Sequence, residues 1–139
     1  MQRVKKMLTD SEAQLYLGGE YRIRIINSWR PLYRPVKNSP LGFCDPWTIQ
    51  KQDLVAVDRP AQDQSSEAYY VKYGAHQDYY WCSNQSQKEI SIFTSWDSKP
   101  ENSPPYCPHA AFKLSEDKTH DIERESIETR TIVVTKVER

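Results

Sequence analysis

The sequence predicts a mainly β protein with one N-terminal helix, folded as a single domain over residues 1–139. Three observations predict this class. Short segments rich in Val, Ile, Tyr and Trp recur along most of the chain, turn-forming Pro, Gly, Ser and Asn residues separate them, and only the first segment has helical spacing. Short strands at regular intervals with turn signals between them are typical of a β-sandwich or barrel.

The predicted helix covers residues 2–17. Its apolar side chains recur with the spacing of an amphipathic helix, at Val4, Met7, Leu8, Leu15 and Tyr16. Two consecutive glycines, Gly18 and Gly19, follow the pattern and would end the helix.

The predicted β region spans residues 20–137. Within 21–27 the pattern alternates, with Ile23 and Ile25 on one face and Arg22 and Arg24 on the other, as in a half-buried strand. Residues 29–45 contain three prolines and predict an ordered coil. Further strands are expected at 53–58, 68–73, 78–82, 89–96, 109–114 and 126–137.

Composition limits the class of partner. Lys plus Arg equals Asp plus Glu at nineteen each, so the net charge is zero and a nucleic-acid-binding role is not expected. No segment approaches the roughly 20 apolar residues of a membrane span, and no apolar run follows the N-terminus as in a signal peptide. Three cysteines without a Cys-x-x-Cys motif favour reduced thiols and a cytoplasmic location. The mean hydropathy of −0.83 is low for a domain that folds alone. Two interpretations stay open: the chain lacks part of its natural core, or it forms a homo- or hetero-oligomer.

The most informative chemistry lies near the C-terminus. His109 stands on a strand-like segment, and Arg124 and Ser126 follow it. An imidazole can bind a metal, and a guanidinium with a hydroxyl two residues away on the same strand face can bind a carboxylate. We therefore expect His109 and Arg124 on neighbouring strands, in a site for a metal and a 2-oxo acid. A salt bridge from Arg124 to Glu125 or Glu128 is the competing interpretation, and Arg130 on the same face is a structural or substrate-side charge.

Other residues allow two interpretations each. Asn27, Trp29 and Arg30 could line a substrate pocket; alternatively Trp29 anchors the coil and Arg30 caps backbone carbonyls. His76 and Asp78 form a His-x-Asp pair that resembles two metal ligands, but a polar pair beside a turn is the favoured interpretation.

Three further features are assigned structural roles. Cys107 with His109 could form a nucleophilic pair, which we do not favour. His120 lies among polar residues and is expected to be a solvated loop residue. The tyrosine-rich segments around Tyr69 and Tyr79 are expected to form core and one exposed aromatic face.

The order of motifs resembles that of the asaB hydroxylase/desaturase family, which includes gibberellin desaturase and CmcJ-like proteins. The resemblance covers about 21–134, corresponding to the C-terminal part of the family's fold. The motifs that carry it are Ile26-Asn27-Ser28-Trp29-Arg30-Pro31-Leu32, Ser39-Pro40-Leu41, Cys44-Asp45, Trp96-Asp97-Ser98, Cys107-Pro108-His109-Ala110-Ala111-Phe112 and Arg124-Glu125-Ser126-Ile127-Glu128-Thr129-Arg130.

The resemblance implies a partial double-stranded β-helix (jelly roll), with iron(II) and 2-oxoglutarate as cofactors. It implies that His109 corresponds to the distal iron ligand, and that Arg124 and Ser126 hold the far carboxylate of 2-oxoglutarate. The family's His-x-Asp ligand pair lies upstream of the segment that matches Asn27, and this chain has no histidine before His76.

The implied function is a dioxygenase-like hydroxylase or desaturase, hence an oxidoreductase, that acts on a small-molecule intermediate of fungal or bacterial natural-product (secondary metabolite) biosynthesis. The alternatives are a non-redox cyclase or isomerase on such an intermediate, and an inactive truncated homologue.

Overall fold

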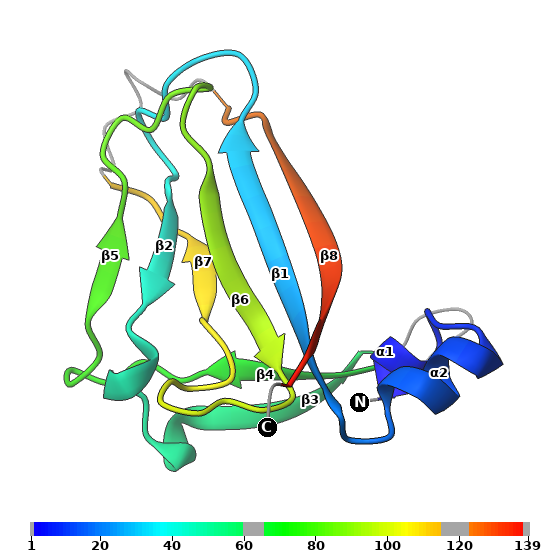
Figure 1. Cartoon of the computed structure of the whole chain (residues 1–139). Helices are drawn as coiled ribbons and strands as arrows, with labels where there is room; N and C mark the ends of the chain where they lie inside the picture. The colour runs from blue at the N-terminus through cyan, green and yellow to red at the C-terminus, as the bar shows by residue number, and fades with distance from the viewer. Residues whose placement is uncertain (1, 60–65, 115–122, 138–139) are drawn as a thin grey trace.

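The computed structural model describes residues 2–59, 66–114 and 123–137 (Figure 1). Its helical elements are α1 (Gln2–Lys5), α2 (Asp10–Tyr16) and two short 3₁₀ turns, η1 (Pro46–Thr48) and η2 (Lys51–Asp53). Its strands are β1 (Tyr21–Pro31), β2 (Leu41–Cys44), β3 (Leu54–Arg59), β4 (Ser66–Val71), β5 (Tyr79–Trp81), β6 (Ser91–Asp97), β7 (His109–Ala111) and β8 (Ser126–Lys136). The prediction of a mainly β chain is confirmed.

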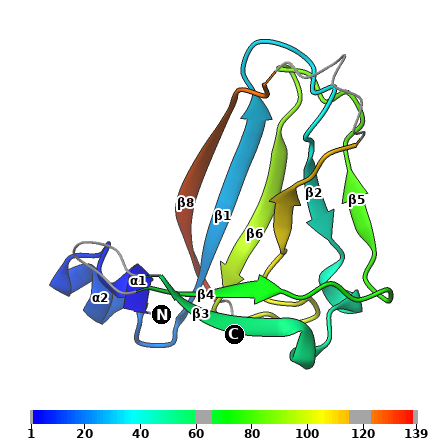
Figure 2. The ribbon, with the colours of Figure 1, turned by 180° about the vertical axis from the view of Figure 1, so that it is seen from behind.

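Two three-stranded antiparallel sheets face each other (Figures 1 and 2). One sheet has the order β6-β1-β8 and is called the β1 sheet; the other has the order β5-β2-β7 and is called the β2 sheet. The β3–β4 hairpin runs across one end of both sheets. From β5 onward, consecutive strands alternate between the two sheets, as they do in a jelly roll.

The inner face of the β1 sheet follows directly from strand alternation. Every second residue of β1, from Ile23 to Pro31, is buried, while the residues between them are less buried. The antiparallel register places even-numbered residues of β8, such as Glu128 and Arg130, beside these buried residues of β1. The inner face of β8 is therefore polar beside Asn27 and Trp29 and apolar, with Ile132 and Val134, beside Ile25 and Ile23.

The main core lies between the two sheets. Trp29 of β1 and Phe93 of β6 pack with Leu41 of β2 and with Val36, and Phe43 and Cys107 complete this cluster. The rings of Phe43 and Phe93 meet edge to face at 5.0 Å and so join the β2 sheet to the β1 sheet. This apolar packing holds the β1 sheet and the β2 sheet face to face.

A second cluster holds the helical region against the end of the β1 sheet. Val4, Ile23 and Ile25 are buried there with partly buried partners that include Leu8 and Ile132. The prediction of one continuous helix over residues 2–17 is wrong, because the chain leaves helical structure between α1 and α2. Thr9 begins α2 with a capping box: its side chain accepts from the Glu12 amide, and the Glu12 carboxylate accepts from the Thr9 amide at 2.8 Å.

The prediction of coil over residues 29–45 is also wrong at both ends. β1 continues to Pro31, where the ring's missing N–H falls at the strand terminus, and the Leu32 amide still donates to the Glu125 carbonyl at 3.0 Å. β2 forms after the last of the three prolines. Gly42 of β2 lies so close to Phe112 that a Cβ atom there would be 2.9 Å from the Phe112 ring, so this position needs glycine for close packing.

Candidate carboxylate-binding site

The Arg124 side chain is held against the core by a ring contact and a hydrogen bond. It lies just before β8, its guanidinium carbon is 5.1 Å from the centre of the Trp29 ring, and Nη1 donates to the Ser39 carbonyl at 2.8 Å. Its Nε is buried and has no hydrogen-bond partner. Burial lowers the pKa of Arg124, because removing water disfavours the charged form. A buried cation with an unused N–H is suited to bind a carboxylate, to which the N–H would donate.

The surroundings of Arg124 form a small pocket of about 60 Å³. The residues that line it come from two segments, 34–38 and 123–125, and include the cations Arg34 and Lys37 and the acids Glu123 and Glu125. In the described part of the chain no ion pair joins Arg124 to an acid, and the ion pair of Glu128 is with Arg130 at 3.7 Å. The geometry therefore does not support the alternative of an Arg124 salt bridge to Glu125 or Glu128.

Ser126 is the first residue of β8 and lies opposite Pro31 in the ladder. Pro31 belongs to the buried face of β1, so Ser126 lies on the inner face of the β1 sheet, in the position expected for a hydroxyl near Arg124.

His109 is the first residue of β7 and is half-buried. Its ring lies 4.4 Å from the Phe93 ring, and its Nδ1 is 2.9 Å from the Cys107 carbonyl. A carbonyl only accepts hydrogen bonds, so Nδ1 is the donor, and in the neutral imidazole the lone pair then lies on Nε2. An imidazole held in this way by a backbone carbonyl is oriented as metal-binding histidines commonly are.

The sequence predicted His109 and Arg124 on neighbouring strands, but the structure places them in different sheets. β7 belongs to the β2 sheet, and the segment of Arg124 leads into β8 of the β1 sheet. The prediction is wrong because consecutive strands of this fold alternate between sheets. Both side chains nevertheless contact the same core cluster, His109 through Phe93 and Arg124 through Trp29.

Asn27 is the centre of a buried polar cluster beside this core. It is fully buried at 0% exposure. Its Oδ1 accepts from Ser95 at 2.8 Å and from Arg130 Nε at 3.3 Å, and its Nδ2 donates to Glu128. These partners come from β6 and β8, so Asn27 ties both neighbours to β1. The sequence interpretation included Asn27 and Arg130, and named Glu128 only as a possible partner of Arg124; it missed Ser95 and the contact of Glu128 with Asn27. The alternation of β8 was the signal that could have placed Glu128 on the face of Asn27.

Trp29 and Arg30 lie on opposite faces of β1. Trp29 is 2% exposed and belongs to the core cluster under Arg124. Arg30 is exposed and donates to the Gln87 carbonyl at 2.8 Å, as in the interpretation that it caps a backbone carbonyl. Trp29 therefore contacts Arg124, whereas Arg30 lies on the other face of β1 and does not share this site.

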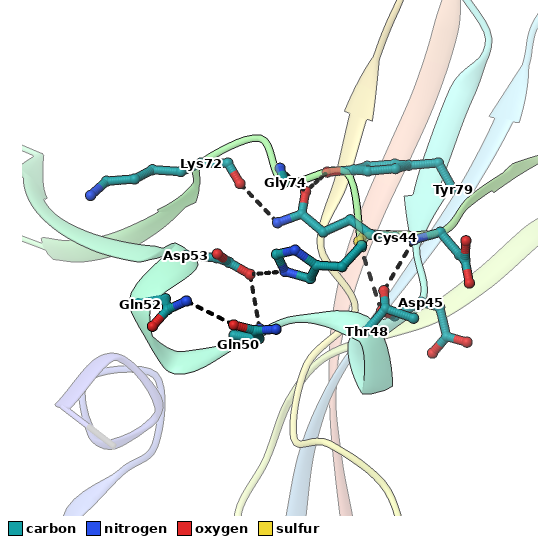
Figure 3. A network of polar contacts seen from close by, with 12 residues as sticks. Cys44, Asp45, Thr48, Gln50, Gln52, Asp53, Lys72, Gly74 and Tyr79 are labelled. Atoms are coloured by element: carbon teal, nitrogen blue, oxygen red, sulfur yellow. Dashed lines mark hydrogen bonds and ion pairs between the residues drawn. The ribbon is translucent and has the colours of Figure 1, made fainter.

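His76 and Asp78 lie in the loop between β4 and β5 rather than on a strand. Their partners Asp53 and Thr48 belong to a separate polar network around the η2 turn (Figure 3). His76 Nε2 is 2.8 Å from the Asp53 carboxylate, and the Asp78 amide donates to Thr48 at 3.1 Å. Hydrogen bonds from the Gln50 amide and then from His76 lower the pKa of Asp53. His76 and Asp78 thus have different partners, which agrees with the interpretation of a polar pair beside a turn.

Cys107 does not act with His109 as a nucleophile pair. The imidazole contacts the Cys107 carbonyl, and burial raises the pKa of the Cys107 thiol, so the thiol stays protonated. The expectation for His120 concerns a residue outside the described ranges.

The described residues fit one of the two implied cofactors. Arg124, with its unpartnered buried Nε, fits a carboxylate such as that of 2-oxoglutarate. Within residues 2–59, 66–114 and 123–137, no three His, Cys, Asp or Glu side chains gather closely enough to hold a metal ion. His109 alone therefore does not fit iron(II), which needs a set of ligands.

A family model described as "Oxidoreductase/YMDC permease-like domain" matches residues 1–134. The chain belongs to this oxidoreductase-like family. Among its relatives are the asaB hydroxylase/desaturase of Aspergillus flavus, 28% identical over 94% of this chain and 62% of the relative, and the hydroxylase/desaturase efuI of Hormonema carpetanum, 33% identical over 83% of this chain and 42% of the relative. The predicted resemblance to the asaB group is confirmed.

The fold has a solved counterpart. A variant of the iron and alpha-ketoglutarate-dependent endoperoxidase NvfI superposes with a TM-score of 0.84 at 28% identity, over 98% of this chain and 48% of that chain. The prediction of a jelly roll is confirmed. The chain spans about half the length of most of the relatives it matches. Among the described residues, no helix has the length and apolar character needed to span a membrane.

Proposed function

We propose that this chain is a dioxygenase-like hydroxylase or desaturase homologue of natural-product biosynthesis, and that its own contribution is to bind the carboxylate of a 2-oxo acid. The observation that carries the proposal is the buried, unpartnered Nε of Arg124. A free carboxylate would accept from this Nε–H and from a second guanidinium N–H, with Ser126 as a further donor.

His109 contributes an imidazole whose Nε2 is free to bind. In a complete iron(II) site of the kind that relatives are named for, the metal would supply oxygen activation. The described residues lack the remaining ligands, so the steps assigned to this chain are binding the co-substrate and orienting it against Trp29. The substrate would be a small-molecule biosynthetic intermediate, and the expected site of action is the cytoplasm.

A non-redox role is the second candidate, because carboxylate binding through Arg124 needs no metal. A pocket that orients a flexible intermediate can promote cyclisation or isomerisation through positioning alone. The same Arg124 site would then hold a carboxylate of the substrate itself.

Equilibrium dialysis with labelled 2-oxoglutarate, in the presence of EDTA and separately with added iron(II), tests the proposal. We expect saturable binding in EDTA that Arg124→Met abolishes. Oxygen consumption coupled to 2-oxoglutarate loss after iron addition would favour the redox role, and turnover of an intermediate in EDTA without oxygen uptake would favour the second. Absence of saturable binding under both conditions would refute carboxylate binding.

A further inference from the structure

The Arg124 guanidinium is fixed by two contacts that leave its Nε unused. Nη1 donates to the Ser39 carbonyl at 2.8 Å, and Cζ lies 5.1 Å from the centre of the Trp29 ring. In the planar guanidinium, Nη1 lies on the side of Cδ, whereas Nη2 and the Nε–H share the opposite edge. Within the described ranges Nη1 is the nitrogen with an acceptor, and Nε is buried without one. The two contacts therefore leave the edge formed by Nε and Nη2 for a ligand.

The carbonyl that holds Nη1 belongs to a residue with an unusual backbone. Ser39 has a left-handed conformation with a φ of 57°. Residues other than Gly, Asn and Asp seldom adopt it, because Cβ crowds the following carbonyl oxygen. Such a conformation persists only where the surrounding contacts determine it, and it is found disproportionately at ligand sites. At Ser39 the result of this conformation is a carbonyl directed at Arg124.

The segment that contains Ser39 is held at both ends. Val36 is buried in the main core, and its amide donates to the Gln85 carbonyl at 2.9 Å. Pro40 is also buried, and its carbonyl accepts from the Phe112 amide at 3.4 Å. The chain must therefore turn between two anchored points, and Ser39 lies inside that turn.

Asn38 holds the middle of the turn. Its Oδ1 accepts from the Ser39 amide at 2.9 Å and from the Leu114 amide at 3.1 Å. One side-chain oxygen thus orients the backbone of Ser39 and joins the turn to the chain that follows β7. Removing this oxygen would free the Ser39 backbone to rotate and leave the two anchored ends in place.

We propose that Asn38 and Ser39 are positioning residues for Arg124, and that their turn directs a carboxylate to the edge of the guanidinium formed by Nε and Nη2. The binding mode is side-on: the Nε–H and one Nη2–H donate to the two carboxylate oxygens, and Nη1 stays with the Ser39 carbonyl. This inference rests on the proposed function and adds the geometry by which the carboxylate is held.

A fixed guanidinium favours binding because an arginine side chain is long and rich in rotamers. A side chain that is free to rotate loses this freedom when a ligand binds, which lowers the affinity. For Arg124 that freedom is already lost in the folded chain, through Ser39 and Trp29. The carboxylate also satisfies the buried Nε–H that folding leaves without an acceptor.

Side-chain ¹⁵N spectra of arginine during titration with 2-oxoglutarate test the binding mode in the unmodified chain. Because the Ser39 carbonyl restrains rotation of the guanidinium, Nη1 and Nη2 of Arg124 should give separate signals before any ligand is added. We expect 2-oxoglutarate to shift the Nε signal and one Nη signal and to leave the other Nη signal in place. A merged Nη signal in the free chain, or shifts of both Nη signals with Nε unmoved, would overturn the proposal.

Two variants that both lack the Ser39 hydroxyl test the backbone conformation. Valine is strongly disfavoured at a φ of 57°, whereas glycine adopts it readily. Ser39→Val should therefore raise the dissociation constant of 2-oxoglutarate about tenfold relative to Ser39→Gly, measured by calorimetric titration. The pattern of shifts in the unmodified chain tests the proposal even if a variant at this position does not fold.

Asn38→Ala should also weaken binding about tenfold, and it should merge the two Nη signals of Arg124. Asn102→Ala is the matched control, because it makes the same substitution at an exposed position in the loop between β6 and β7 and should change neither quantity. Equal affinities of Ser39→Val and Ser39→Gly, or unchanged affinity and separate Nη signals in Asn38→Ala, would overturn this inference alone. An unmodified chain without saturable 2-oxoglutarate binding would refute the proposed function and this inference with it.

Discussion

Arg124→Met separates a binding role for the guanidinium from a structural one. The variant loses the hydrogen bond to the Ser39 carbonyl, worth about 1 kcal/mol, and the contact with the Trp29 ring, worth about 1 kcal/mol. It also removes a buried Nε–H without a partner, whose desolvation costs about 1–3 kcal/mol. These contributions nearly cancel, so the free energy of unfolding should change by no more than about 1 kcal/mol.

The same variant should lose most of its affinity for 2-oxoglutarate. A carboxylate held by two charge-assisted hydrogen bonds loses about 3 kcal/mol when the guanidinium is removed, which is a hundredfold or more in dissociation constant. Urea unfolding followed by circular dichroism measures the first quantity, and calorimetric titration with 2-oxoglutarate measures the second.

Arg24→Met is the matched control for both measurements. Arg24 also has a buried Nε without a partner, but it donates to Thr135 and lies on the other face of β1 from Trp29. The Arg24→Met variant should therefore bind 2-oxoglutarate with unchanged affinity. The reasoning would be refuted if Arg124→Met lowered the free energy of unfolding by several kcal/mol and still bound 2-oxoglutarate. That result would show that Arg124 is a structural residue.

Three further predictions concern the scaffold. Asn27→Asp places a second carboxyl against Glu128, so the pKa of the pair rises and the free energy of unfolding should fall between about pH 4 and pH 7; an unchanged denaturation curve over that range would contradict the contact. The pKa of Asp97 is lowered chiefly by hydrogen bonds from Arg22, so its stabilisation is present above the unfolded value of about 3.9 and is lost as the pH falls through the lowered one; the stability difference from Asp97→Asn, measured by denaturant titration, should shrink on acidification, and a constant difference would count against it. Gly42→Ala places a methyl group 2.9 Å from a phenyl ring and should cost about 1–3 kcal/mol in thermal unfolding, so an unchanged melting temperature would show that the ring moves freely.

Much of the fold could be predicted because alternation is a local signal. The pattern of Ile23 and Ile25 identified β1, and turn residues marked most other strands within a few positions. Pro31 misled the prediction because its effect depends on whether the missing N–H falls inside a ladder or at its end. The break between α1 and α2 was missed because the helical apolar spacing continues past the capping box at Thr9.

The site was only partly predictable. His109, Arg124 and Ser126 were found by residue type and resemblance, and their contacts with Phe93, Trp29 and the inner face are visible only in three dimensions. Sequence spacing also suggested adjacent strands, whereas the alternation between sheets separates His109 from Arg124. The partners of Asn27 come from strands far away in the chain, so no local pattern could identify them.

We propose the Arg124 guanidinium as the carboxylate receptor of this chain. The most direct measurement is the ¹H–¹⁵N spectrum of arginine Nε–H groups during titration with 2-oxoglutarate. We expect the Arg124 Nε–H resonance, assigned by its loss in Arg124→Met, to shift and saturate, while the Arg24 resonance stays in place. A titration that leaves the Arg124 resonance unmoved, or that moves all arginine resonances alike, would contradict it.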